Sequence, residues 1–199
     1  HDQVFFGATV NRIGRLYRTD GTTAGTQEIA PFPFFSEIRL FNQSSRVCVL
    51  NSLSDWVFFV ASSATESGEF LWRINAAGSN GERVTSAAGR LIVPPISIAR
   101  LGTSLLFYSS DGAQQGWWRI NTPAAAPDLF VNESTVTNGS RRILTVVGNL
   151  VYFESCDGNG QCSLSRTDGT AAGTIALAPA NLSTFAPPSV GVLGDRVLF

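Results

Sequence analysis

Four arginines recur along the chain, and each is followed two residues later by an aspartate or an asparagine. The pairs are Arg18 with Asp20, Arg73 with Asn75, Arg119 with Asn121 and Arg166 with Asp168. Such groups could form a ligand-binding ring, or the two aspartates could bind calcium. A calcium site needs about six to eight oxygen ligands, and no acidic cluster surrounds either aspartate. We therefore expect a structural role for these residues.

Two of the three cysteines flank a turn sequence. Cys156 and Cys162 lie on either side of Asp157-Gly158-Asn159-Gly160. A hairpin that closes there brings the two side chains within reach of a disulfide, for which the Cα atoms lie about 5.5 Å apart. Two buried thiols are one alternative, and half of a zinc site is another, although His1 is the only histidine. We predict the disulfide, which favours an oxidising compartment, and a buried Cys48.

Groups suited to catalysis are scarce. Because His1 is the sole histidine, a serine or cysteine nucleophile lacks a base inside the fold, and copper lacks a second imidazole. Paired carboxylates that cleave glycosides stay open as a remote alternative, but the glutamates are scattered. We predict a protein that is not an enzyme and that has no metal or cofactor.

Charge and hydropathy exclude two classes of partner. The net charge of −1 over 199 residues provides no basic field for nucleic acid. No apolar run approaches the roughly 20 residues that cross a bilayer, so we expect no membrane insertion. The chain begins at His1 and contains no methionine, and we expect a processed product or part of a longer protein.

The arginine pairs belong to a repeat. Leu16–Thr26 returns as Leu164–Thr174, and two weaker copies lie at Leu71–Asn75 and Trp117–Asn121. The four arginines are 55, 46 and 47 residues apart. A unit that recurs at this spacing is a supersecondary element that buries its apolar face only against its neighbours.

Each repeat contains four predicted strands. A second recurring element ends in phenylalanine: Val4–Phe6, Val57–Phe59, Leu105–Phe107, Val151–Phe153 and Val197–Phe199. From the second copy on, a β-branched run and a two-residue turn precede it, as in 96–101 with 102–103 and 143–147 with 148–149. The arginine strand and a short outer run follow, at 27–30, 82–85, 128–131 and 174–177. These short runs predict strands, and no window has helical periodicity.

Four antiparallel strands in about 46 residues match the size of a propeller blade. We predict an all-β, four-bladed β-propeller in one domain, 1–199. Its repeat units are 1–45, 46–95, 96–141 and 142–188, and residues 189–199 close or extend the ring. Each arginine shares a face with the apolar residue two positions before it. We expect its stem to lie on apolar surface and its head to donate to neighbouring carbonyls or carboxylates.

The two complete copies resemble the Glu-Leu-Trp-x-x-Asp-Gly-Thr-x-x-Gly-Thr repeat of long, mostly bacterial, secreted and surface proteins. The matching residues are Asp20-Gly21-Thr22 with Gly25-Thr26, and Asp168-Gly169-Thr170 with Gly173-Thr174. The second copy keeps Glu69–Arg73 but has Asn75 and lacks the Gly-Thr pair, and the third keeps only Trp118–Asn121. The resemblance implies a propeller-like, non-enzymatic extracellular module and no particular substrate.

The motif residues suit a tight turn. An Asp-Gly pair lets the glycine adopt a positive φ while the aspartate bonds back to the chain. The threonine hydroxyls can satisfy loop amides, and the second glycine permits a close backbone approach.

Asn-x-Ser acceptors for glycans occur at Asn42, Asn132, Asn138 and Asn181. All four are predicted to lie between an outer strand and the first strand of the next unit. Sugars there would cover the face that carries the Cys156–Cys162 tip and leave the Asp-Gly-Thr turns bare. The alternative is that asparagine is simply common in loops.

The strand count leaves one strand over. Val4, Phe5 and Phe6 already fill the place in a four-bladed ring that Val197, Leu198 and Phe199 would take. The surplus strand extends a longer array, packs on its own propeller, or completes a blade in another subunit by strand addition.

We predict an extracellular structural protein that assembles head to tail with itself into a glycosylated filament or surface layer. The alternative is a carbohydrate-binding or adhesive propeller that uses Trp72, Trp117 and Trp118. The core between blades is the expected place for these tryptophans.

Overall fold

The computed structural model describes residues 3–10, 13–29, 51–62, 69–79, 81–95, 97–134, 139–182, 191–194 and 196–198. All regular elements in this part of the chain are strands. They are β1 (Val4–Val10), β2 (Ile13–Thr19), β3 (Gln27–Glu28), β4 (Asn51–Leu53), β5 (Trp56–Ser62), β6 (Glu69–Asn75), β7 (Glu82–Arg83), β8 (Ile98–Leu101), β9 (Ser104–Ser110), β10 (Gln115–Ile120), β11 (Asp128–Asn132), β12 (Ser140–Val147), β13 (Leu150–Cys156), β14 (Cys162–Thr167), β15 (Ile175–Leu182), β16 (Gly191–Leu193) and β17 (Arg196–Leu198). Over these ranges, no helix is long and apolar enough to span a membrane.

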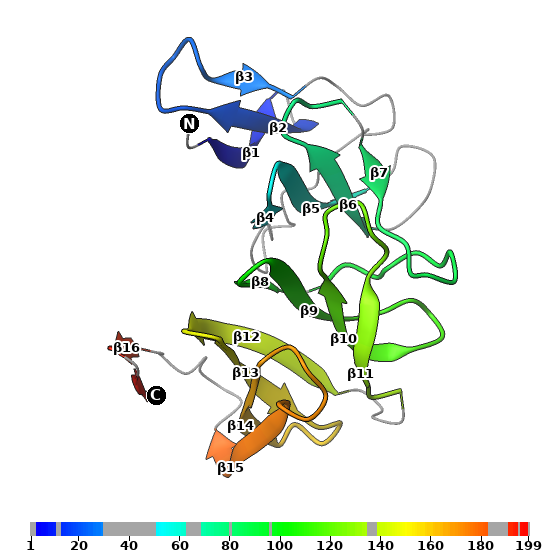
Figure 1. Cartoon of the computed structure of the whole chain (residues 1–199), viewed down its shortest axis with the longest axis vertical. Helices are drawn as coiled ribbons and strands as arrows, with labels where there is room; N and C mark the ends of the chain where they lie inside the picture. Colours follow the sequence, from blue (N-terminus) through cyan, green and yellow to red (C-terminus); the bar gives the residue numbers. More distant parts are fainter. Residues whose placement is uncertain are drawn as a thin grey trace.

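Each repeat forms its own antiparallel sheet. The sheet orders are β1-β2-β3, β4-β5-β6-β7, β8-β9-β10-β11, β12-β13-β14-β15 and β16-β17. We call the first four sheets blades 1 to 4, in chain order, and the last the terminal hairpin. The blades fan out around a common centre, with β4 and β8 inside and β3, β7, β11 and β15 outermost (Figure 1). The all-β propeller of antiparallel blades is thus confirmed, together with the surplus strand, β17.

The fan is open within the described residues. Blade 1 and blade 4 lie at its two ends, and β1 has no strand on its inner edge (Figure 1). The terminal hairpin pairs β16 with β17, through Val192 and Val197, and does not pair β16 with β1. Among the described residues it therefore forms a separate two-stranded sheet.

Two local predictions need correction. The strands expected to end at phenylalanine continue past it, so that β5 runs on from Phe59 to Ser62 and β13 from Phe153 to Cys156. The boundary between residues 141 and 142 falls inside β12, which begins at Ser140. In both cases backbone pairing to the neighbouring strand extends beyond the apolar residues that revealed the strand.

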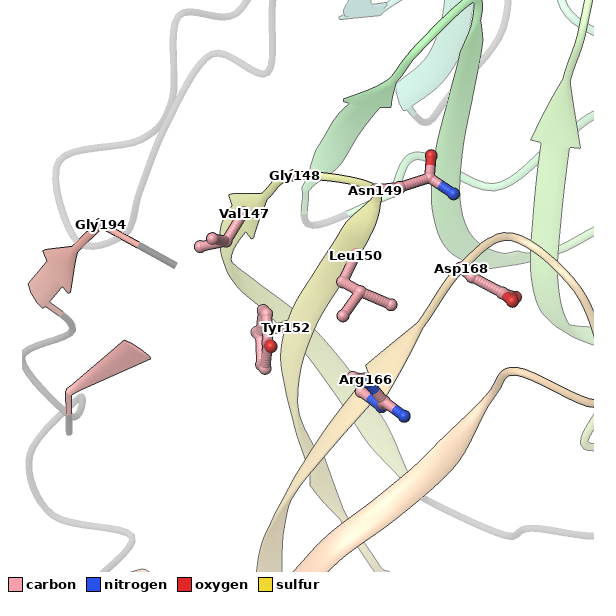
Figure 2. A pocket seen from close by; sticks show the side chains of 8 residues that line it. All are labelled: Val147, Gly148, Asn149, Leu150, Tyr152, Arg166, Asp168 and Gly194. Atoms are coloured by element: carbon pink, nitrogen blue, oxygen red, sulfur yellow. The ribbon is translucent and has the colours of Figure 1, made fainter. Parts of the chain in front are cut away.

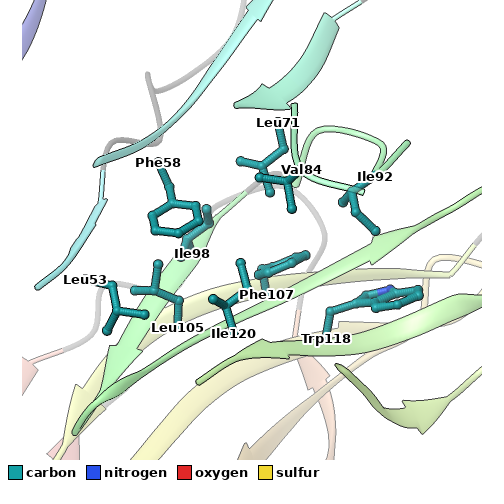
Figure 3. Packing of buried hydrophobic residues seen from close by; sticks show 10 residues of the cluster. All are labelled: Leu53, Phe58, Leu71, Val84, Ile92, Ile98, Leu105, Phe107, Trp118 and Ile120. Carbon is teal, nitrogen blue, oxygen red and sulfur yellow. The ribbon is translucent and has the colours of Figure 1, made fainter. Parts of the chain in front are cut away.

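The blades pack face to face through large apolar side chains. Blade 2 presents Phe58 and Leu71 to Phe107 and Trp118 of blade 3, and all four are at most 2% exposed (Figure 3). Blade 1 covers a second cluster, in which Leu16 and Ile29 meet residues of β5 and β6. Between blades 3 and 4, the rings of Trp117 and Phe153 lie 4.5 Å apart, centroid to centroid. The core thus consists of successive interfaces between neighbouring blades.

Candidate functional site

In the first three blades the repeated arginine joins its blade to the next. Its terminal nitrogen donates to a carbonyl in the turn between the third and fourth strands of the following blade. The bonds are Arg18 Nη1 to Ala76 O (2.9 Å), Arg73 Nη1 to Pro123 O (2.8 Å) and Ala125 O (2.7 Å), and Arg119 Nη1 to Gly169 O (2.9 Å). Charge-assisted hydrogen bonds of this kind are stronger than neutral ones. The arginines therefore fix the register of one blade on another.

A second contact holds each of these arginines within its own blade. The acceptor lies nine residues further on, in the fourth strand: Arg18 to Gln27 (3.1 Å), Arg73 to Glu82 (2.9 Å) and Arg119 to Asp128 (3.2 Å). The side chain is thereby aimed at the next blade before it makes contact. The corresponding position in blade 4 is Ile175, which has no side-chain acceptor.

Arg166, the blade 4 member of the set, lacks both contacts. It makes no hydrogen bond or ion pair with any residue that the structure describes. Its Nε is buried without a partner, as is that of Arg119, but Arg119 satisfies its terminal nitrogens. Arg166 is thus a half-buried cation without the carbonyl that the other three arginines bind.

Arg166 faces an open depression of about 720 Å³ (Figure 2). The lining comes from the β12–β13 turn, from the neighbouring strands and from the terminal hairpin: Val147, Gly148, Asn149, Leu150, Tyr152, Arg166, Asp168 and Gly194. Leu164, on the same face of β14, is already 2% exposed. The depression therefore lies at one end of the outer face of blade 4, the end where Tyr152 and Arg166 are located.

Asp168 supplies the one acidic group among these lining residues. Hydrogen bonds from the Thr170 hydroxyl and the Thr170 backbone amide lower the pKa of Asp168, and the positive charge of Arg166 lowers it further. Its carboxylate is thus ionised at neutral pH, but Oδ1 is already bonded within the turn. The lining residues that the structure describes include no histidine, cysteine or serine. These groups can hold a carbonyl-bearing partner, and they include no nucleophile with an imidazole base.

The opposite end of the fan exposes a matching apolar face on blade 1. Val4 is 61% exposed, and Phe6 stacks on Tyr17 with ring centroids 5.6 Å apart. The corresponding positions in blade 2, which are Val57, Phe59 and Trp72, are only 2%, 1% and 4% exposed because blade 1 covers them. The same surface is therefore core in blade 2, whereas in blade 1 Val4 is exposed and Phe6 and Tyr17 are half-buried.

The Asp-Gly-Thr turns of blades 1 and 4 are nearly identical. Asp20 Oδ1 accepts from the Thr22 amide (2.9 Å) and hydroxyl (2.7 Å), and Thr22 Oγ1 accepts from the Gly25 amide (2.9 Å). Asp168 and Thr170 make the same bonds at 2.9 and 2.7 Å, and Thr170 Oγ1 accepts from Gly173 N at 3.0 Å. The aspartate carboxylate and the threonine hydroxyl of each turn are thus hydrogen-bonded within that turn.

The glycines of these turns have two different roles. Gly21 and Gly169 have positive φ values of 92° and 87°. A Cβ on Gly25 or Gly173 would lie 1.9 or 2.0 Å from the aspartate Oδ1 of its own turn. The close approach at the second glycine therefore comes from this carboxylate, whereas a backbone approach was expected.

The two weaker copies build their turns differently. Asn75 accepts from the Ser79 amide at 2.9 Å, whereas Asn121 Oδ1 accepts from the Ser104 hydroxyl, also at 2.9 Å, in strand β9. Asparagine thus replaces aspartate without reproducing its turn.

The predicted disulfide joins Cys156 and Cys162, which lie opposite each other in β13 and β14. Glu154 lies close to both cysteines: one of its carboxylate oxygens and the two sulfurs lie within 4.8 Å of one another, a spacing that could hold a metal ion. Its carboxylate pairs with Arg142 at 3.0 Å, and sulfurs bonded to each other are not thiolate ligands. The two cysteines therefore form a disulfide, which indicates an oxidising compartment, and they do not form a metal centre with Glu154.

The four glycan acceptors do not share one kind of position. Asn132 is exposed at the end of β11, and its Oδ1 accepts from the amide (2.9 Å) and hydroxyl (2.7 Å) of Ser134. Asn181 lies inside β15 and not in the connection where it was expected, because that strand extends to Leu182. Asn42 and Asn138 lie outside the described residues, as do Cys48, Phe199 and His1.

The sequence predicted the arginines but not the open face beside the last of them. Tyr152 belongs to the recurring strand element and Asn149 to the turn before it, but neither pattern indicated an open face, and only their place at the end of the fan makes them notable. One signal was available, since Ile175 stands where the other repeats have Gln27, Glu82 and Asp128. An arginine without its usual neighbour marks the blade that differs.

Comparison with known proteins supports the fold alone. No protein-family model matches the sequence, and no curated protein is significantly similar to it. The structure is similar to that of TolB from Acinetobacter baumannii, a β-propeller protein, with a TM-score of 0.56 and 12% sequence identity. The match covers 89% of this chain and 41% of the TolB chain. The present chain thus spans less than half of the protein that it matches.

Proposed function

We propose that this chain is a non-enzymatic structural subunit that joins copies of itself head to tail outside the cytoplasm. The observation that carries the proposal is that the described residues place no strand on the inner edge of β1. In blades 2 to 4 a first strand occupies that edge, whereas the described part of blade 1 has only its second, third and fourth strands. The terminal hairpin carries the kind of strand that blade 1 lacks.

Strand addition would use the pairing already present in the chain. β16 pairs with β17 as β4 pairs with β5 and as β12 pairs with β13. Because β17 repeats the Val4–Phe6 strand, β1 of a second copy can take its place beside β16. Backbone hydrogen bonds then hold the two copies together. Val192 and Leu193 of β16 are 50% and 67% exposed, which leaves them accessible to a partner.

The contact joins two different surfaces, so each added copy presents a new free edge. Such heterologous contacts generate a filament when they do not close into a ring. We propose a filament or surface layer as the product. The disulfide supports an extracellular or cell-surface setting.

Glycosylation belongs to the same proposal. Asn132 lies exposed on an outermost strand, where a sugar would not enter the interface between blades. Protein purified from its native source should lose mass on treatment with an endoglycosidase. An intact mass equal to that of the sequence less two hydrogens would exclude glycans and retain the disulfide.

Carbohydrate binding through the tryptophans is not favoured. Trp72, Trp117 and Trp118 are 4%, 0% and 2% exposed, so none offers a ring face to a sugar.

Electron microscopy of the purified chain tests the proposal. We expect elongated particles, and we expect them to be lost in Leu193→Pro. Leu193 and Arg196 flank the two-residue turn of the hairpin and so form a hydrogen-bonded pair. Proline at 193 therefore removes a backbone donor that β16 directs at its partner strand. Leu193→Thr keeps the strand geometry and should assemble like the original chain. Circular dichroism of both variants should show intact blades. Separate single fans in the original chain, or particles unchanged in Leu193→Pro, would contradict the proposal.

A further inference from the structure

We infer that Arg166 binds the Gly21 carbonyl of a second copy and so fixes how successive copies stack. This inference rests on the head-to-tail assembly proposed above and names the side-chain contact that gives it register. The occupant of the open face of blade 4 is then blade 1 of another copy.

The first argument is the turn that all three other arginines bind in the following blade. Arg119 of blade 3 donates to the Gly169 carbonyl of blade 4, and Arg18 donates to the carbonyl of Ala76, the matching turn residue of blade 2. Arg73 donates within the same turn of blade 3, but to Pro123 and Ala125. By analogy with Arg18 and Arg119, we assign Arg166 a carbonyl at the matching position of a following blade. The terminal hairpin contains only first and second strands, so it has no turn of this kind among its described residues.

The second argument is that blade 1 carries this turn in an uncovered state. Gly21 and Gly169 occupy equivalent places in turns with the same hydrogen bonds. A Cβ built on Gly169 would lie 3.4 Å from Leu106 and 3.6 Å from Leu101 of blade 3. The same construction on Gly21 meets nothing within 4 Å. No arginine in the described residues donates to the Gly21 carbonyl.

The third argument is that the covering residues have counterparts at the open face. Leu101 precedes its turn as Val147 does, and Leu106 pairs with Arg119 as Tyr152 pairs with Arg166. Both Val147 and Tyr152 line the depression beside Arg166 (Figure 2). An Asp-Gly-Thr turn seated there would therefore meet two apolar side chains and one guanidinium, as in the blade 3 to blade 4 interface.

The fourth argument is apolar complementarity. The face that blade 1 would bring to blade 4 contains Val4, Phe6 and Tyr17, whose counterparts in blade 2 are buried by blade 1. Burial of such surface is the main favourable term in association, and the arginine supplies orientation.

Arg166→Ala tests the contact through the strength of self-association. Loss of a charge-assisted hydrogen bond should weaken the association constant about tenfold to a hundredfold. The association constant of Arg166→Lys should lie between those of Arg166→Ala and the original chain, because lysine keeps the charge but lacks the planar guanidinium group. Arg100→Ala removes an exposed arginine of blade 3 and should associate like the original chain.

The thermal unfolding temperature of the single subunit separates this role from a structural one. Because Arg166 makes no hydrogen bond or ion pair with the described residues, and its charge is the smallest of the contributions that lower the pKa of Asp168, its removal should change that temperature little. A fall in unfolding temperature with unchanged association would overturn the inference. If the original chain does not associate at all, both the assembly proposal and this inference are overturned. If the Arg166→Ala variant associates as strongly as the original chain, only this inference is overturned.

Cross-linking locates the contact directly. Copies with Asn149→Cys and copies with Thr23→Cys, each with Cys48→Ser, are mixed and treated with a short bismaleimide. The positive control for reach is one chain with Thr103→Cys and Ala171→Cys, the equivalent pair between blades 3 and 4. We expect a dimer from the mixture and none from either copy alone. An assembled mixture that yields no dimer, while the control links, would overturn the inference.

Discussion

A single arginine per blade shows how much a residue's role depends on its neighbours. The side chain shares a strand face with an apolar residue, so a structural role could be predicted from alternation in the sequence. Its acceptor could not, because the bond from Arg73 reaches Pro123 and Ala125, which belong to the next blade. Only the stacking of blades brings a donor and an acceptor about 50 residues apart into contact.

Arg73→Ala should destabilise the fold markedly. Arg73 is 8% exposed and bonds to two carbonyls of blade 3 and to Glu82. Removing it leaves these groups without their donor, at a cost of about 2–3 kcal/mol. Urea denaturation followed by tryptophan fluorescence measures the loss. A variant as stable as the original chain would show that water satisfies the carbonyls equally well.

Asp111 should make stability depend on pH in the acidic range. Burial alone would raise its pKa, but the backbone amides of Gln114 and Ala113 and the Ser86 hydroxyl together lower the pKa below the usual value. The folded state thus holds a proton less readily than the unfolded chain. The stabilisation is present above the unfolded pKa of about 3.9 and is lost as pH falls through and below it.

Thermal unfolding across this pH range, in the original chain and in Asp111→Asn, isolates the contribution. The asparagine variant should be less stable at neutral pH, and the difference should shrink as the acid form accumulates. A difference that is constant with pH would exclude titration of Asp111 as its source.

At the scale of the elements, strands and turns were predictable because their signals are local. β-branched and aromatic runs indicated the strands, and pairs such as 102–103 and 148–149 are the turns that the structure shows. Strand ends were less predictable, because the backbone ladder continues through polar residues such as Ser109 and Ser110. The turns of the weaker repeats also escaped prediction, since Asn75 and Asn121 each find a different partner.

Ser54→Gly should stabilise the protein. Ser54 has a φ of 54°, and glycine occupies the same turn position in blades 3 and 4, with φ values of 57° at Gly102 and Gly148. A residue with a side chain pays about 1–2 kcal/mol to adopt the left-handed region, and glycine avoids this cost. Glycine also loses more backbone entropy on folding, which offsets part of the gain. We expect a net gain of about 0.5–1 kcal/mol in the free energy of unfolding.

The matched control is Gly102→Ala, where a Cβ would meet no atom within 4 Å. It imposes the backbone cost without a steric clash, and so it should lower stability by about 1 kcal/mol. If Ser54→Gly or Gly102→Ala leaves the free energy of unfolding unchanged, the argument from φ is contradicted.

At the scale of the whole molecule, the number of blades was predictable and their closure was not. The repeat count depends on sequence spacing, whereas closure depends on the angle between blades, which the side chains packed between them set. Large residues such as Phe58, Trp117 and Phe107 fill these interfaces, and the four blades form an open fan (Figure 1). Within the part of the chain that the structure describes, Arg166, the inner edge of β1 and the apolar face of blade 1 lack the partners that their counterparts have.

The central claim is that these unpartnered features of the two ends belong to one contact between copies. Sedimentation velocity of the unmodified chain over a wide range of concentration tests it most directly. The account predicts species heavier than one chain whose size increases with concentration. A single species with the mass of one folded chain at every concentration would contradict it.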